Sequence, residues 1–228
     1  MSLILNIDTS SENASICIAR NGDSIAMLEN GQQKDHAAWI HPAIKLILKQ
    51  VQISVQNLNA VAVAAGPGSY TGLRVGMSTA KGLCYALNIP LITENTLRVM
   101  ALAAKQVIED RVDMKNILIS PMLDARRMEV FTALFREDLQ EVLPSCALIL
   151  DSDTFSEYLL KSEIFFSGNG STKFRPFVTH DHAIFSEVHH SAVHLATLSN
   201  KKFVAKQFDD IAYTEPLYLK EFYTVPKK

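Results

Sequence analysis

The 228-residue chain has little excess charge of either sign and no long hydrophobic run. Its 22 Lys and Arg against 24 Asp and Glu give a formal net charge of −2, so we expect no general attraction to nucleic acid. No apolar stretch approaches the roughly 18 residues that a membrane span needs. The first apolar run is short and is broken by Asn6 and Asp8, which excludes a signal peptide. We therefore expect neither a membrane protein nor a secreted one.

Cysteine is also scarce. Cys17, Cys84 and Cys146 are odd in number, lie far apart within apolar runs, and form no C-x-x-C pair. Such residues are typical of small core side chains in a reducing compartment. The cysteines therefore predict a cytoplasmic protein, and they form neither a disulfide framework nor a metal site.

The apolar periodicity predicts three strands, then a helix, a strand, a helix, a strand and a helix in the first half, and an echo of this order in the second half. In the first half we expect strands at 3–7, 14–20, 24–28, 60–64 and 91–93 and helices at 37–51, 70–87 and 97–108. The second half is more irregular, with strands at 117–123, 129–136, 147–150 and 164–167 and helices at 154–161 and 192–199. Two tandem βββαβαβα units indicate the α/β class and the actin-like ATPase (ASKHA, RNase H-like) fold. We predict domains 1–110 and 111–228, divided in the polar stretch 109–116, with the last helix able to pack back on the first domain.

The most informative segment is the turn GPGSYTGLRVG at residues 66–76, between a strand and a helix. Gly66 and Gly68 permit backbone angles that other residues resist, and Ser69 is a good N-cap. A helix N-terminus at such a turn suggests an anion cradle. However, Gly72 is not followed by the lysine of a Walker loop, and the spacing does not fit the dinucleotide fingerprint. Spacing alone therefore favours a close-packed turn without a ligand.

Two hairpins carry acidic residues. Asp8, Thr9 and Ser10 lie in the first hairpin, and Asp124 lies in the second. The two aspartates could face each other across a cleft and position a metal-bound water or a phosphate. The alternatives are an Asx turn at Asp8 and a turn anchored by Asp124, for example by pairing with Arg126. The candidate phosphate-loop residues are Asp8, Thr9, Ser10, Gly66, Gly68, Ser69 and Asp124.

Histidines gather near the end of the chain. His190 and His194 have metal-ligand spacing, with His180 and His182 nearby. We expect Ser191 to cap the following helix, which would place His190 outside the helix and spoil the spacing. The pattern therefore favours a surface histidine cluster, and we predict no metal site.

The two long helices of the first half have more apolar surface than packing on one sheet requires. In helix 37–51 the apolar residues cover roughly 200° of the circumference, where about 100° suffices. Helix 70–87 has a large-residue face and a second, small-residue face. We predict a helix docking surface made of Trp39, Ala43, Leu46, Val75, Thr79, Gly82 and Ala86. The alternative is that both helices are simply buried within one domain.

The turn at 66–76 closely resembles the signature of the TsaB (YeaZ-type) family. The segments LILNIDTSSENASICIA (3–19), KDHAAWIHPAIKLIL (34–48), MLDARRMEVFTALF (122–135) and EPLYLKEF (215–222) resemble further motifs of that family in the same order. Lys220 stands where the family usually has arginine. The resemblance implies an actin-like fold and a subunit of the bacterial machinery that makes tRNA threonylcarbamoyladenosine (t6A).

One departure from the catalytic relatives, the TsaD subunits, is informative. Those relatives hold a metal with an Asn-His-x-x-x-His segment after their glycine turn. The matching residues here are Asn95, Thr96 and Met100, so both histidines are missing. A hydroxyl and a thioether do not replace two imidazoles. The resemblance therefore implies a relative that has kept the fold and lost the metal chemistry.

The function implied by the resemblance is a non-catalytic scaffold for threonylcarbamoyl transfer to N6 of adenosine 37 in tRNAs reading ANN codons. The implied partners are a catalytic TsaD-like subunit, a TsaE-like small ATPase, and a second copy of the chain when it is alone. Contact with tRNA is expected only through the complex, and no cofactor is implied. The rival is a nucleotide-dependent phosphotransferase or hydrolase using Asp8, Asp124 and the loop from Gly66 to Gly72.

Overall fold

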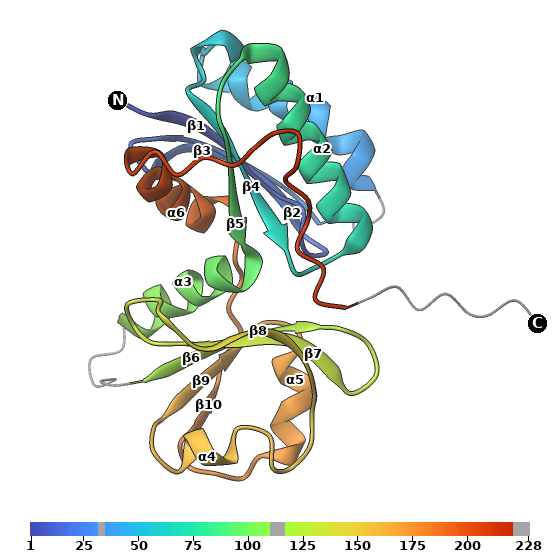
Figure 1. Cartoon of the computed structure of the whole chain (residues 1–228), viewed down its shortest axis with the longest axis vertical. Coiled ribbons are helices and arrows are strands. Elements are labelled where there is room, and N and C mark those ends of the chain that lie inside the picture. Colours follow the sequence, from blue (N-terminus) through green and yellow to red (C-terminus); the bar gives the residue numbers. More distant parts are fainter. Residues whose placement is uncertain (32–34, 110–116, 221–228) are drawn as a thin grey trace, which may run out of the picture.

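The computed structural model describes residues 1–31, 35–109 and 117–220. They form two α/β units, each built on a five-stranded sheet and placed one above the other in Figure 1. The predicted domain boundary between residues 110 and 111 lies outside the described residues.

The first unit repeats the predicted order of elements. It consists of β1 (Leu3–Asp8), β2 (Ala14–Arg20), β3 (Asp23–Asn30), α1 (His36–Gln50), β4 (Ala60–Gly66), α2 (Tyr70–Leu87), β5 (Leu91–Asn95) and α3 (Thr96–Glu109). A short 3₁₀ helix, Val55–Asn57, precedes β4. The strand order is β3-β2-β1-β4-β5; β1 to β3 are antiparallel neighbours, and β4 and β5 run parallel to β1.

The second unit has the same topology. It consists of β6 (Leu118–Asp124), β7 (Glu129–Phe135), β8 (Glu141–Ile149), α4 (Ser156–Leu159), β9 (Ile164–Ser167), α5 (Ser171–Phe174), β10 (Ala183–Phe185) and α6 (Ala192–Val204). Its strand order, β8-β7-β6-β9-β10, places corresponding strands in corresponding positions. The predicted duplicated actin-like fold is therefore confirmed. The predicted helix 154–161 is shorter than expected, and α5 and β10 were not predicted.

Local sequence accounts for the well-predicted elements. All seven residues of β4 are buried, as expected for a parallel strand covered on both faces. The β2–β3 hairpin turns at Asn21 and Gly22, whose φ values are 54° and 94°. Helix α2 begins at the predicted cap, where the hydroxyl of Ser69 accepts the N–H of Gly72, and ends at Asn88 in the left-handed conformation.

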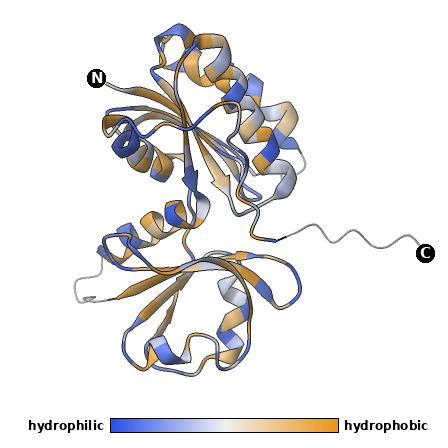
Figure 2. Ribbon diagram, viewed as in Figure 1, coloured by the Kyte–Doolittle hydropathy of each residue, from blue (hydrophilic) through white to orange (hydrophobic). Residues whose placement is uncertain are grey.

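The last helix of each unit lies between the two sheets. Helices α1 and α2 cover one face of the first sheet, α6 packs against β1 and β2, and α3 packs against β6. One core cluster joins both units; it includes Ile4, Ala62, Leu102, Phe135 and Leu195. Apolar residues dominate the strands of both sheets and alternate with polar ones along the helices (Figure 2). Within the described ranges, no helix is long and apolar enough to cross a membrane.

After α6 the chain returns across the first unit (red in Figure 1). We call residues 205–220 the C-terminal strap. The N–H of Leu217 donates to the carbonyl of Ala65 at 2.7 Å. The ammonium of Lys81 on α2 donates to the carbonyls of Ala212 and Thr214, at 3.4 and 3.0 Å. The strap thus lies against the glycine turn and one side of α2.

Candidate functional site

Asp8 lies at the end of β1 and is almost completely buried. Its Oδ1 accepts the backbone N–H of Ser10 at 3.0 Å and the hydroxyl of Ser10 at 2.6 Å. This is the Asx turn that the sequence offered as the local alternative to a catalytic carboxylate. One oxygen of Asp8 is therefore used to shape the loop between β1 and β2.

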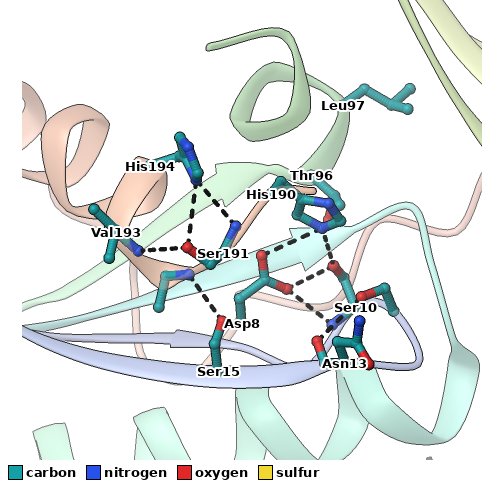
Figure 3. A network of polar contacts seen from close by, with 12 residues as sticks. Asp8, Ser10, Asn13, Ser15, Thr96, Leu97, His190, Ser191, Val193 and His194 are labelled. Carbon is teal, nitrogen blue, oxygen red and sulfur yellow. Dashed lines mark hydrogen bonds and ion pairs between the residues drawn. The ribbon is translucent and has the colours of Figure 1, made fainter. Parts of the chain in front are cut away.

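The other oxygen of Asp8 faces a histidine from the far end of the chain (Figure 3). Nε2 of His190 lies 3.5 Å from Oδ2 of Asp8 and 3.4 Å from the hydroxyl of Ser10. The side chain of His190 is only 9% exposed, and Oδ2 of Asp8 makes no hydrogen bond within the described chain. The expected surface histidine cluster is therefore wrong for His190. Since His190 belongs to the segment between β10 and α6, the pair ties the first loop to the chain where it re-enters the first unit.

The predicted cap of α6 is confirmed. The hydroxyl of Ser191 accepts the N–H of Val193 at 3.4 Å, and Nδ1 of His194 accepts the N–H of Ser191 at 3.0 Å. Burial lowers the pKa of His194 from its usual value, and the charge of neighbouring His190 lowers it further. His194 is thus a capping residue, and the described residues contain no group of three or more His, Cys, Asp or Glu that could hold a metal ion.

The first hairpin loop packs directly against the glycine turn. A Cβ on Gly68 would collide with the carbonyl oxygen of Ser10, and a Cβ on Gly72 with that of Thr9. The N–H of Ser69 donates to the carbonyl of Ser10 at 2.7 Å, and the hydroxyl of Thr9 donates to the carbonyl of Gly72 at 2.7 Å. The glycines thus allow the start of α2 to contact the first hairpin loop directly. The structure brings Asp8, Thr9, Ser10, Gly66, Gly68 and Ser69 together as one packed junction.

Thr96 and Met100, the two positions at which the catalytic relatives have histidine, make contacts within the fold. Thr96 is fully buried, and its hydroxyl accepts the N–H of Gly66 at 3.1 Å. Met100 belongs to the core cluster shared by both units, and its Cε packs close to Gly168. Asn95 is held by Ser145, whose hydroxyl accepts its side-chain N–H at 2.8 Å. These residues fasten α3 to the glycine turn and to the second sheet.

Asp124 makes its contacts within the second unit. It is exposed, accepts the backbone N–H of Arg126 at 2.6 Å and pairs with the ammonium of Lys173. It therefore anchors its turn as one alternative predicted, but through the backbone of Arg126 instead of the guanidinium. In the part of the chain that the structure describes, the contacts of Asp124 and those of Asp8 have no residue in common, so they give no support to a facing acidic pair.

The predicted docking residues differ in exposure. Leu46, Gly82 and Ala86 are exposed, and Trp39 and Val75 are half-buried, packing against the core beneath α1 and α2. Ala43 and Thr79 are buried, so they contribute little to the free surface of the chain.

A hollow of about 440 Å³ lies between α1 and α2. Its lining includes His41, Tyr70, Arg74, Val75 and Thr79. Sequence reasoning did not single out Tyr70 or Arg74, although their spacing of four residues places them on one side of the helix.

Comparison with known proteins gives consistent matches. The family described as "TsaD: tRNA N6-adenosine threonylcarbamoyltransferase" matches residues 30–221. The tRNA threonylcarbamoyladenosine biosynthesis protein TsaB of Bacillus subtilis (strain 168) is 34% identical over 150 residues, which cover 64% of this chain and 62% of that protein. TsaB of Escherichia coli (strain K12) is 34% identical over 137 residues, covering 59% and 55% of the two chains. The chain thus spans less than two thirds of these relatives.

The fold has a clear match among solved structures. A Pseudomonas aeruginosa protein described as similar to peptidase YeaZ superposes with a TM-score of 0.82. The match covers 96% of this chain and 100% of that one, at 19% identity. At this identity the likeness shows the fold alone.

Proposed function

Because this chain belongs to the TsaD family of tRNA N6-adenosine threonylcarbamoyltransferases, and within it to the TsaB (YeaZ-type) group, we propose that it is a non-catalytic scaffold subunit. The reaction it serves is transfer of a threonylcarbamoyl group to N6 of adenosine 37 in tRNAs reading ANN codons. Its role is to bind and support a catalytic TsaD-like subunit in the cytoplasm.

The observation that carries the proposal is the set of contacts that Thr96 and Met100 make. Where the catalytic relatives have metal-binding histidines, Thr96 holds the N–H of Gly66 and Met100 lies in the shared core. A metal site needs ligands and also supporting groups that orient them. The contacts of Thr96 and Met100 serve packing, which supports a protein that has kept the fold without the metal chemistry.

The packed glycine turn counts against the rival phosphotransferase or hydrolase. A phosphate loop presents free backbone N–H groups to an anion. Here the N–H of Ser69 is satisfied by the carbonyl of Ser10, and the carbonyls of Thr9 and Ser10 lie where a Cβ on Gly72 or Gly68 would project. Asp8 is buried at the end of β1, directly before Thr9 and Ser10. This geometry favours a structural junction over a nucleotide cradle.

The docking surface that we assign to the catalytic subunit is the exposed side of α1 and α2. Leu46, Gly82 and Ala86 lie on it, and an added Cβ at Gly82 would meet nothing within 4 Å. A partner helix can therefore approach α2 closely there. The same surface serves a second copy when the chain is alone, and a TsaE-like small ATPase joins the assembled complex. With a net charge of −2, the chain contacts tRNA only through its partners.

Gly82→Arg tests the docking surface. Because the position is open, the variant should fold with a melting temperature no lower than that of the wild type, while the long arginine side chain would keep a partner helix from approaching α2 closely. We expect calorimetric titration to show a loss of binding to the catalytic subunit of about 100-fold or more. Leu160→Arg, at an exposed position on the second unit, is the matched control. If both variants bind like the wild type, the interface lies elsewhere.

A further inference from the structure

Helices α1 and α2 contain no aspartate or glutamate, although the whole chain has more acidic than basic residues. The permanently cationic residues on the two helices are Lys45, Lys49, Arg74 and Lys81. Exposed carboxylates occur next to the helices, at Asp35 before the first residue of α1, at Glu29 of β3, and at Asp210 and Glu215 of the strap. The exposed surface of the helix pair is therefore locally positive.

Arg74 is the cation of this surface that two aromatic residues contact. Its guanidinium lies over the ring of Tyr70, 4.0 Å from the ring centre, and its Nε donates to the hydroxyl of Tyr218 at 3.2 Å. Tyr218 is brought there by the strap, next to the Leu217–Ala65 hydrogen bond. Two aromatic residues thus hold the side chain in one place before any partner arrives.

The terminal nitrogens of Arg74 remain available. In the part of the chain that the structure describes, only Nε of this guanidinium makes a hydrogen bond, and the residue is exposed. The end of a guanidinium is a planar fork of N–H donors that matches the two oxygens of a carboxylate. Since the side chain is already fixed, little rotamer freedom is lost when such a pair forms.

The residues around Arg74 fit a protein surface better than a nucleic acid. Val75, Gly82 and Ala86 lie along α2, and Leu46 on α1 is 48% exposed. Small and aliphatic residues along the two helices favour close helix packing, and the net charge of −2 gives the chain no general attraction to nucleic acid. The hollow between α1 and α2 opens beside Arg74.

We propose that the α1–α2 surface selects a partner whose facing helices carry carboxylates, one of which pairs end-on with Arg74. This inference rests on the proposed function, in which the partner is the catalytic subunit. Two copies of this chain would meet through like-charged surfaces, so pairing with the acidic partner is preferred over self-association. The strap contributes indirectly, because Tyr218 positions Arg74.

Salt dependence and charge reversal test the proposal. We expect the affinity for the catalytic subunit to fall between about 0.1 M and about 1 M salt, where the Debye length shrinks from about 10 to about 3 Å. Self-association, followed by analytical ultracentrifugation, should instead increase over the same range. Arg74→Glu should weaken the complex at least about tenfold, with Arg74→Gln and Tyr218→Phe between it and the wild type. Lys45→Glu provides a second reversal on the neighbouring helix.

Arg175→Glu is the matched control. Arg175 is also exposed and lies 6.0 Å from the centre of an aromatic ring, that of Phe185, but it belongs to the second unit. A complex that forms normally with Arg74→Glu, or that tightens with salt, would overturn the charge selection while leaving the scaffold role intact. No binding by the wild type would overturn the scaffold role and this inference together. Loss of tRNA binding in Arg74→Glu, with protein binding unchanged, would make the surface an RNA site and also overturn it.

Discussion

His190 places its Nε2 3.5 Å from a buried carboxylate oxygen of Asp8 that has no hydrogen bond in the described chain. The contact joins the loop after β1 to the segment that enters α6. An imidazole beside a buried carboxylate offsets part of the cost of removing that carboxylate from water. The pair therefore links two segments that are distant in the sequence.

We predict that His190→Ala lowers the free energy of unfolding by about 2 kcal/mol, because it leaves Oδ2 of Asp8 buried without its neighbour. Urea denaturation measures the change. His189→Ala, at the exposed adjacent position, is the control and should stay within about 0.5 kcal/mol. In an Asp8→Asn background the cost of His190→Ala should shrink. Equal costs in both backgrounds would show that the two side chains do not interact.

Two glycines should respond oppositely to alanine. In Gly68→Ala the new Cβ collides with the backbone carbonyl of Ser10, so we expect a loss of about 3 kcal/mol or insoluble protein. In Gly82→Ala the Cβ meets nothing within 4 Å, and the better helix propensity should stabilise the isolated chain by about 0.5–1 kcal/mol. Thermal unfolding of both variants measures these two changes in stability. A harmless Gly68→Ala would contradict the packed junction.

His194 should make stability depend on pH. Burial lowers its pKa below the usual 6.5, so the unfolded chain takes up this proton at a higher pH than the folded chain does. Stability from this group is complete above 6.5 and is lost as the pH falls through the lowered pKa. His194→Gln keeps an acceptor for the Ser191 N–H and removes the titration. Its melting temperature should fall less than that of the wild type between neutral and mildly acidic pH, and parallel curves would contradict this account.

The cysteines should differ in reactivity. Burial raises the pKa of the Cys84 thiol to about 11, and Cys17 is buried with a raised pKa as well. At pH 8 roughly one Cys84 in a thousand is then a thiolate. Cys146 is only half-buried, so iodoacetamide should label it first in the folded protein, as peptide mass spectrometry can show. Early labelling of Cys84 would mean that α2 opens readily.

Local signals predicted much of this structure. The cap residues Ser69 and Ser191 act within a few residues of their own positions, so the sequence alone indicates where α2 and α6 begin. The four-residue α5 and the three-residue β10 are too short to show a periodicity, which explains why they were missed.

Long-range contacts could not be derived in this way. Ser10 and His190 lie 180 positions apart, and Lys173 reaches Asp124 across 49 positions. Such pairs depend on how the sheets and crossing segments assemble, which no local pattern encodes. The capping argument correctly placed His190 outside α6, but the predicted surface cluster wrongly left its side chain exposed.

The most direct test of the central claim is threonylcarbamoyl transfer in a reconstituted mixture. Purified tRNA and the threonylcarbamoyl donor are incubated with this chain alone, with the catalytic subunit alone, with both, and with the catalytic subunit plus Gly82→Arg. The scaffold account predicts no modified adenosine from this chain alone, strong modification with both subunits, and a fall to the level of the catalytic subunit alone with Gly82→Arg. Modification of tRNA by this chain without the catalytic subunit would contradict the account.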